Sequence, residues 1–96
     1  MYGYIYKTTN IINGMIYIGQ SVNIEERWAR HFRADAKNQS YFHRACMKYG
    51  KKNFNFEVLE ECPYEELDEK EKYWISFYNS YNNGYNMTLG GSNNIG

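Results

Sequence analysis

The sequence predicts a single α/β (α+β) domain in which a small, largely antiparallel sheet of three strands is flanked by three helices. Length and composition support one core, because 96 residues suffice for it and a content of 43% hydrophobic and 23% charged residues excludes a charge-rich disordered chain. The hydrophobic patterns give the order of elements: two alternating stretches, two helical stretches, a third alternating stretch and a third helical one. This β-β-α-α-β-α order is typical of small α/β domains.

The first two strands are expected to form a hairpin over residues 2–9 and 15–19. Both stretches are rich in aromatic and β-branched side chains, which favour strands. Asn13-Gly14 between them is a strong hairpin signal, because both residues tolerate positive φ. A two-residue turn at this point would pair Tyr6 with Ser21 and would place Tyr17 on the same face of the sheet as Tyr6.

Two helices are expected between the hairpin and the third strand. Asn23 is a good N-cap for the first helix, and two glutamates follow it in the first turn. The apolar stripe of this helix consists of Ile24, Trp28 and Phe32. The helix is expected to end near Asp35, which would otherwise fall on the stripe. The second helix is expected over residues 40–49, with Gly50 as its stop signal.

The third strand and the third helix are predicted from the same two periods. In residues 53–60, three apolar side chains alternate with mostly polar ones: Phe54, Phe56 and Val58. Pro63 then introduces a helix that starts at residue 64 or 65 and ends at Tyr78. The apolar stripe of this helix consists of Leu67, Trp74, Ile75 and Tyr78. Glu71 lies in the middle of that stripe, whereas the other acidic residues of the helix do not.

The end of the chain, from residue 79 on, is dominated by Asn, Gly and Ser and is predicted to be a loop that packs on the domain through three side chains: Tyr85, Met87 and Leu89. Residues 1–89 are expected to form the domain, and residues 90–96 a flexible tail or the start of a linker. No apolar run approaches the roughly 20 residues of a membrane span, and the first residues lack the features of a signal peptide. The two cysteines have no C-x-x-C spacing, so we expect a reducing, intracellular compartment and no membrane.

The net charge of zero hides a division between the two halves of the chain. Residues 1–53 carry nine Lys and Arg against three Asp and Glu, whereas residues 54–96 carry two against eight. A basic half suits a polyanionic partner such as a nucleic acid. On charge alone, mutual neutralisation of the two halves across the fold explains the division equally well.

Glu71 is the most informative single position. A carboxylate on the buried stripe of a helix costs several kcal/mol unless it is paired or binds a metal. A salt bridge, for example to Arg27 or a lysine, explains Glu71 slightly better than a metal does. The alternative is a ligand for a hard divalent cation, because such cations prefer carboxylate oxygens.

Arg27 and His31 lie at i, i+4 on the first helix and flank its apolar stripe on the same side, so both can reach the same point in space. Taken alone, each is better explained by packing, as an arginine stem that covers Trp28 and as a satisfied core histidine. Their shared position favours a common anionic site. His43 has no such neighbours and is interpreted as a surface residue.

The tyrosines could act chemically only in a special environment. With a pKa near 10, about 0.1% of a tyrosine is ionised at neutral pH, so Tyr6 or Tyr17 can act as a base only where a cation or a hydrogen-bond network favours the phenolate. Arg27 and a metal on Glu71 would provide that environment. Ordinary aromatic packing is the alternative. The sequence contains no G-x-G-x-x-G, P-loop, H-E-x-x-H or G-x-S-x-G motif, so nucleotide binding, zinc hydrolysis and serine chemistry have no support.

Short blocks in order along the chain resemble the motifs of the GIY-YIG nucleases. The two signature motifs correspond to Tyr4-Ile5-Tyr6 and Tyr17-Ile18-Gly19, with ten residues between them. The later blocks are residues 25–32, 48–50, 56–60, 71–75 and 84–86. The resemblance covers almost the whole chain, and its details are most similar to the catalytic domains of phage and group I intron homing endonucleases. In one departure, Tyr4 stands where the first motif normally has glycine, with Gly3 one residue earlier.

The resemblance implies a fold and a set of site residues. The family fold is a three-stranded antiparallel sheet flanked by helices, in agreement with the elements above, and the family places its two motif tyrosines close together, which implies a shifted hairpin register. By resemblance, the catalytic residues are two tyrosines, an arginine, a supporting histidine and asparagine, and a metal-binding glutamate: Tyr6, Tyr17, Arg27, His31, Asn86 and Glu71.

The function that this implies is metal-dependent hydrolysis of DNA phosphodiester bonds, one strand per active site, by the catalytic module of a homing-type endonuclease in a bacterial or phage-infected cell. Glu71 would hold one Mg²⁺, with Mn²⁺ as a substitute, and Arg27 would neutralise transition-state charge. Tyr6, relayed through His31, would deprotonate the attacking water, and Tyr17 would orient it. Seven basic residues are candidates for contacts to DNA phosphates, although for each one an ordinary position on a solvated helix face is about as good an explanation. They are Arg30, Arg33, Lys37, Arg44, Lys48, Lys51 and Lys52.

The expected partner is DNA, and the expected oligomeric state is a monomer. The sequence contains no recognition helix, zinc knuckle or basic arm, so we expect weak binding with little sequence preference, and a separate or C-terminal targeting module outside this chain. Two other functions fit the same sequence. One is a non-catalytic nucleic-acid-binding or interaction module on the same fold, and the other is a stand-alone repair or restriction nuclease.

Overall fold

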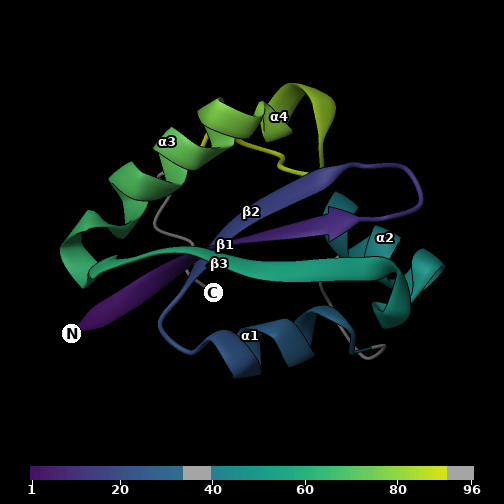
Figure 1. Cartoon of the computed structure of the whole chain (residues 1–96), viewed down its shortest axis with the longest axis horizontal. Coiled ribbons are helices and arrows are strands. Elements are labelled where there is room, and N and C mark those ends of the chain that lie inside the picture. Colours follow the sequence, from purple (N-terminus) through teal and green to yellow (C-terminus); the bar gives the residue numbers. More distant parts are fainter. Residues whose placement is uncertain (34–39, 91–96) are drawn as a thin grey trace.

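β1 (Tyr2–Asn10) lies at the centre of a three-stranded antiparallel sheet in the computed structural model, which describes residues 1–33 and 40–90. β2 (Ile16–Ser21) and β3 (Phe54–Pro63) are its two neighbours, in the order β2-β1-β3. In the view of Figure 1, α3 (Leu67–Tyr78) and α4 (Ser80–Asn83) lie above the sheet and α1 (Ile24–His31) lies below it. The predicted fold class is confirmed.

The hairpin of β1 and β2 has a longer connection than predicted. Tyr6 lies opposite Gly19, and not opposite the residue two positions further along β2. The connection spans residues 11–15, and Gly14 is its only residue with a positive φ, at 76°. The predicted register is therefore wrong by two residues. Because the shift is an even number, each side chain keeps its face, and Tyr6 and Tyr17 lie on the same face, as predicted.

The first two helices begin where the sequence predicts. The Asn23 side chain accepts a hydrogen bond from the Glu26 amide at 3.2 Å and caps α1. α1 ends at His31, earlier than predicted, and Asp35 lies outside the described residues. Ser40 caps α2 (Tyr41–Tyr49), and Gly50 ends it with a φ of 82°. No helix in the two described ranges is long and apolar enough to cross a membrane.

The two faces of the sheet carry two separate apolar cores. Under α3, the buried cluster consists of Ile5, Ile18, Cys62, Leu67 and Ile75, with Trp74 and Tyr78 packed against it. This confirms the predicted stripe of the third helix. The opposite face is covered by α1 and α2, and its buried cluster consists of Phe42, Ala45, Cys46, Phe54 and Tyr85. The second cluster is mostly aromatic, and the candidate site is built beside it.

β3 departs from simple alternation. The pairing of β1 with β3 shifts between Ile5 and Tyr6, which marks a bulge. Phe54 is buried, and the Phe56 ring packs on Trp28 with 4.2 Å between centroids. Val58, which pairs with Tyr6 next to the bulge, is 47% exposed. The extra residue of the bulge is Leu59, so Phe54, Phe56 and Val58 keep one face of the strand, as their alternation predicts.

The end of the chain is only partly as predicted. Tyr85 is buried, but Met87 and Leu89 are 62% and 66% exposed, so the prediction that these two pack on the domain is wrong. The Tyr85 amide donates to the Ile16 carbonyl at 2.9 Å, which anchors the chain at β2, and the apolar side chains beyond lie on the surface. The short α4 stands where a loop was predicted. Residues 91–96 of the expected tail lie outside the described residues.

Candidate active site

Gly19 allows the ring of Tyr6 to lie across β2. The two residues are directly opposite in the sheet, and a Cβ atom at Gly19 would overlap Cζ and the hydroxyl oxygen of Tyr6. Tyr6 is fully buried, and its hydroxyl is thus held above the edge strand, not over the middle of the sheet. Gly19, the last residue of the second motif, is therefore required to make room for the ring of Tyr6 in the first motif.

Tyr6, Tyr17 and His31 form a compact cluster on this face. The ring centroids of the two tyrosines are 6.2 Å apart, and those of Tyr17 and His31 are 5.6 Å apart. The Tyr6 hydroxyl lies 2.7 Å from Nε2 of His31, in a buried hydrogen bond. Tyr17 also stacks flat on Phe42 of α2, with 4.2 Å between centroids. Packing from α2 therefore fixes the position of the second tyrosine.

Arg27 reaches the same cluster from one turn earlier in α1. Its Nη1 donates to the carbonyl oxygen of Gln20 at 3.2 Å. Its side chain also hydrogen-bonds to Tyr6 and lowers the pKa of that hydroxyl. Arg27 and His31 thus both meet Tyr6, as their i, i+4 spacing predicts.

Glu71 approaches from α3, on the other side of the sheet. Gln20, which is 3% exposed, donates from Nε2 both to Oε1 of Glu71 at 3.1 Å and to Oδ1 of Asp68 at 2.9 Å. The charge of Glu71 raises the pKa of Tyr17 and of Tyr6, so its carboxylate is electrostatically coupled to the tyrosine cluster. Gln20 therefore joins two halves of the site: its carbonyl holds Arg27 and its amide holds Glu71.

Asn86 binds the backbone of β2. Its Oδ1 accepts from the Ile18 amide at 2.9 Å and from the Ser80 hydroxyl at 2.7 Å, and its Nδ2 donates to the Ile18 carbonyl at 2.8 Å. The chain can approach this closely because a Cβ at Gly84 would overlap the carbonyl oxygen of Ile16. The side-chain amide thus replaces a neighbouring strand at this point of the edge. Asn86 supports the strand that carries Tyr17 and Gly19.

The pKa values of the two tyrosines are raised. Burial is the main cause for Tyr6, whose pKa lies well above 10; Tyr17 adds to the effect and Arg27 opposes it. Burial, followed by the charge of Glu71, raises the pKa of Tyr17 to about 12. Arg27 acts in the predicted direction, but burial outweighs it, so both side chains are neutral hydroxyls at neutral pH.

His31 is neutral as well. Burial, followed by the charge of Arg27, lowers its pKa from 6.5 to about 3. A neutral imidazole carries its proton on one ring nitrogen and accepts at the other, so the direction of the Tyr6–His31 bond depends on the tautomer: with the proton on Nδ1, Nε2 accepts from the Tyr6 O–H. The side chains of Arg27, Tyr6 and His31 thus form a chain of hydrogen bonds through the buried cluster.

The oxygen atoms beside Glu71 suit a hard divalent cation. Oε1 of Gln20 is buried and has no hydrogen-bond partner among the described residues, and the same side chain contacts two carboxylates. Mg²⁺ prefers such oxygen ligands and usually retains several waters. The described residues contain no group of three or more His, Cys, Asp and Glu side chains that could hold a metal. A cation held by Glu71 would therefore rely on few protein ligands.

The other predicted residues lie outside the cluster. Arg30 pairs with Glu26 at 2.7 Å on the exposed side of α1. The remaining candidate cations within the described residues are exposed: Arg33, Arg44, Lys48, Lys51 and Lys52. Lys37 lies outside the described residues. The surface interpretation of His43 is wrong: it is 5% exposed, and its Nδ1 lies 3.1 Å from the His31 carbonyl oxygen.

The sequence reasoning did not identify Gln20, Gly19 or Asp68 as parts of the site. Gly19 ends the second motif, but no pattern within one strand shows which ring lies over a glycine of the next strand. Gln20 follows the second motif directly and faces α3, as the period of β2 would allow. Its contacts depend on the packing of α3 against β2, which no local pattern gives.

Comparison with known proteins identifies close relatives of this arrangement. A model of the GIY-YIG catalytic domain matches residues 2–86. Intron-associated endonuclease 1 of Enterobacteria phage T4 is 38% identical in an alignment of 88 residues, and the match covers 86% of this chain and 36% of that protein. The chain therefore spans about a third of the length of this curated relative.

Solved structures show the same fold. The catalytic domain of intron endonuclease I-TevI, in a glutamate-to-alanine variant, superposes with a TM-score of 0.81 at 35% identity and covers 94% of this chain and 97% of that one. A second structure, of the catalytic domain of homing endonuclease I-TevI, gives a TM-score of 0.76 at 35% identity over 90% and 98% of the two chains.

Proposed function

The chain belongs to the GIY-YIG family of nuclease catalytic domains, and on this premise we propose that it is the catalytic module of a homing-type DNA endonuclease that needs a divalent metal ion. The observation that carries the proposal is the bond of 2.7 Å between the Tyr6 hydroxyl and His31, within a cluster that also contains Arg27 and is coupled to Glu71. We expect Mg²⁺ to be the metal ion and Mn²⁺ to be able to replace it, because both ions suit oxygen ligands.

The proton path uses the hydrogen-bond chain directly. With the His31 proton on Nδ1, Tyr6 takes a proton from the attacking water while its own hydroxyl proton passes to Nε2 of His31. The scissile phosphate brings negative charge close to His31, and a nearby negative charge raises the pKa of a histidine, which makes His31 a better acceptor when substrate is bound. Tyr17, fixed by its stack on Phe42, orients the water or the phosphate.

Charge in the transition state is met by two groups. Arg27 places its guanidinium beside Tyr6, where it can donate to the phosphate oxygens as charge develops. Glu71 would hold the metal ion, which when bound acts as a Lewis acid on the scissile phosphate and stabilises the leaving oxygen. Asn86 keeps β2 in place beneath the site. With one such carboxylate, each active site cuts one strand.

The targeting of the enzyme lies outside this chain in our proposal. The curated relative is nearly three times as long as the matched region, which supports a separate or C-terminal DNA-targeting module. The domain acts as a monomer inside a cell. Its two cysteines are free and buried, as a reducing compartment allows.

Nicking of supercoiled plasmid at low salt, with Mg²⁺ or with EDTA, tests the proposal. Wild-type protein is expected to nick only with the metal, and Glu71→Ala is expected to lose nicking while it stays folded. Glu69→Ala is the matched control, because Glu69 is an exposed carboxylate on the same helix. Arg27→Ala is expected to slow cleavage by about two orders of magnitude. Full activity of a folded Glu71→Ala would rule out the metal-ligand role, and no nicking by wild type fused to a DNA-binding domain would favour a non-catalytic module.

A further inference from the structure

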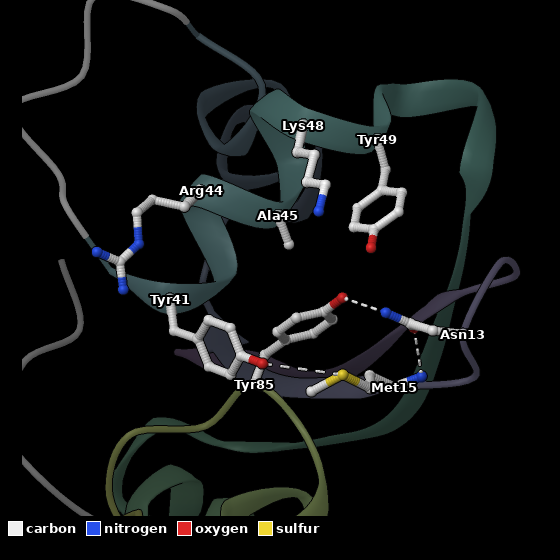
Figure 2. A pocket seen from close by; sticks show the side chains of 8 residues that line it. All are labelled: Asn13, Met15, Tyr41, Arg44, Ala45, Lys48, Tyr49 and Tyr85. Atoms are coloured by element: carbon white, nitrogen blue, oxygen red, sulfur yellow. Dashed lines mark hydrogen bonds between the residues drawn. The ribbon is translucent and has the colours of Figure 1, made fainter.

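A cavity of about 220 Å³ lies between the β1–β2 connection and α2, outside the catalytic cluster. Its lining residues are Asn13, Met15, Tyr41, Arg44, Ala45, Lys48, Tyr49 and Tyr85. Figure 2 shows Lys48 and the hydroxyls of Tyr49 and Tyr85 turned toward its centre, while the guanidinium of Arg44 points outward at the rim. None of the catalytic residues lines the cavity.

The cavity is nevertheless close to the site. Tyr85 immediately precedes Asn86, and its ring centroid lies 5.7 Å from that of Phe42. Phe42 in turn stacks on Tyr17 at 4.2 Å. One aromatic ring therefore separates the buried wall of the cavity from the catalytic tyrosine.

The hydroxyl of Tyr85 is a donor with no acceptor among the described residues. It accepts from Nδ2 of Asn10 at 3.0 Å and from Nδ2 of Asn13 at 3.2 Å. The orientation of both amides is determined by the chain, because their oxygens accept from the backbone amides of Ile12 and Met15, each at 2.9 Å. Both lone pairs of the Tyr85 oxygen are thus used, and its proton is available for an acceptor. Tyr85 is 2% exposed, so this donor is built into the wall.

The charge of the cavity has one sign. Arg44 and Lys48 are four residues apart on α2 and therefore lie on the same side of the helix. No Asp or Glu is among the lining residues. Within the described residues, no carboxylate lies at salt-bridge distance from either cation. The ammonium of Lys48 lies 5.2 Å from the centre of the Tyr49 ring. A cavity that offers donors and positive charge, and no acidic group, suits an anion with several acceptor oxygens.

We propose that this cavity binds a backbone phosphate of the DNA substrate, outside the scissile position, through Lys48 and the Tyr85 hydroxyl. The anion is assigned to DNA on the basis of the proposed function, because the cavity lies one ring from the catalytic tyrosine and all of its lining residues except Tyr85 belong to the basic half of the chain. The contact anchors and orients the strand and carries no sequence information.

DNA binding measured in EDTA, without cleavage, tests the inference separately from catalysis. Wild type, Lys48→Gln and Lys72→Gln are titrated with a fluorescent duplex at several salt concentrations. Lys72 is the matched control, an exposed lysine on α3 that does not line the cavity. Lys48→Gln is expected to weaken binding roughly tenfold and to lower the slope of log K against log salt by about one, while Lys72→Gln changes neither.

Tyr85→Phe removes the donor without a change in charge, so affinity is expected to fall at an unchanged salt slope. Because Tyr85→Phe also loses the bonds to Asn10 and Asn13, its thermal unfolding is measured in parallel. If Tyr85→Phe does not fold, the comparison of Lys48→Gln with wild type decides the test. Equal DNA affinity of Lys48→Gln and Lys72→Gln would overturn the inference. If the wild-type protein still nicks plasmid with Mg²⁺ when this inference fails, the nuclease assignment remains intact.

A second arm uses inorganic phosphate as the probe, observed by NMR at the tyrosine rings of the cavity. Shifts of Tyr49 and Tyr85 with phosphate that DNA also produces, and that Lys48→Gln abolishes, support the assignment. Shifts with free phosphate alone would show a small-anion site and would overturn the assignment to DNA.

Discussion

Substitution of Gly19 by alanine tests the packing on which the candidate site depends. The new methyl group would occupy the space of Cζ and the hydroxyl oxygen of Tyr6. Tyr6 is fully buried, and its ring contacts those of Phe56 and Tyr17, with centroids 5.4 Å and 6.2 Å away. The ring cannot simply rotate into open space, so it must shift together with its neighbours.

Two magnitudes follow from this overlap. An additional methyl group in a packed interior costs about 1–3 kcal/mol of folding free energy. The Tyr6–His31 bond of 2.7 Å is broken if the hydroxyl moves beyond about 3.5 Å from Nε2, and a displacement of about 1 Å in a reacting group costs on the order of 100-fold in rate. We therefore expect Gly19→Ala to lose about two orders of magnitude in cleavage rate.

The assay is single-turnover plasmid nicking with Mg²⁺, at a temperature where each variant is folded by circular dichroism. Gly50→Ala is the matched control: Gly50 has a φ of 82° and a ψ of 155°, a conformation that only glycine adopts easily, and nothing would contact the new methyl group. It is expected to lose about 1–3 kcal/mol of stability and to keep its cleavage rate. A folded Gly19→Ala that cuts at the wild-type rate would refute the role of this glycine.

Three further substitutions have defined outcomes. Gln20→Ala removes the hydrogen bond to the Glu71 carboxylate, so the Mg²⁺ concentration for half-maximal nicking is expected to rise several-fold. Partial rescue by Gln20→Asn would indicate that Gln20 positions Glu71. An unchanged Mg²⁺ requirement in Gln20→Ala would contradict this role. Asn86→Ala leaves the Ile18 amide and carbonyl unpaired, and urea unfolding is expected to show a loss of about 1–3 kcal/mol, whereas a loss below 0.5 kcal/mol would contradict the clamp. Because the pKa of His31 is about 3 when folded and 6.5 when unfolded, its neutral form stabilises the fold above pH 6.5, and this stability is lost as pH falls. Urea titrations between pH 6.5 and 5 should show a decrease of up to about 1.4 kcal/mol per pH unit that His31→Gln lacks, and an equal slope in both proteins would argue against a buried neutral histidine.

The elements and most of the site could be predicted from local sequence patterns. Asn23 caps α1, as predicted, and Ser40, at the predicted start of the second helix, caps α2. Both could be predicted because capping depends on neighbouring residues only. Arg27 and His31 meet at one point because their spacing on a helix places them there. The position of Glu71 on the third helix predicted a constrained carboxylate, and both explanations left open for it involved a nearby partner.

The remaining features depend on distances between elements. The hairpin register followed from a five-residue connection, which the Asn13-Gly14 signal did not indicate. The burial of His43 arises from the packing of α2 against the end of α1, where it meets the His31 carbonyl. Neither arrangement has a signal within one element, because each is decided by how two elements pack.

The binding of residues 84–86 to β2 links catalytic competence to the synthesis of these three residues. A growing chain acquires both motif tyrosines within its first 17 residues, but the edge of β2 stays unpaired until Gly84, Tyr85 and Asn86 leave the ribosome. Until then the strand that carries Tyr17 lacks its outer support, and its open edge can pair with another chain. The cell that makes this protein therefore meets an assembled active site only after nearly the whole domain has been translated.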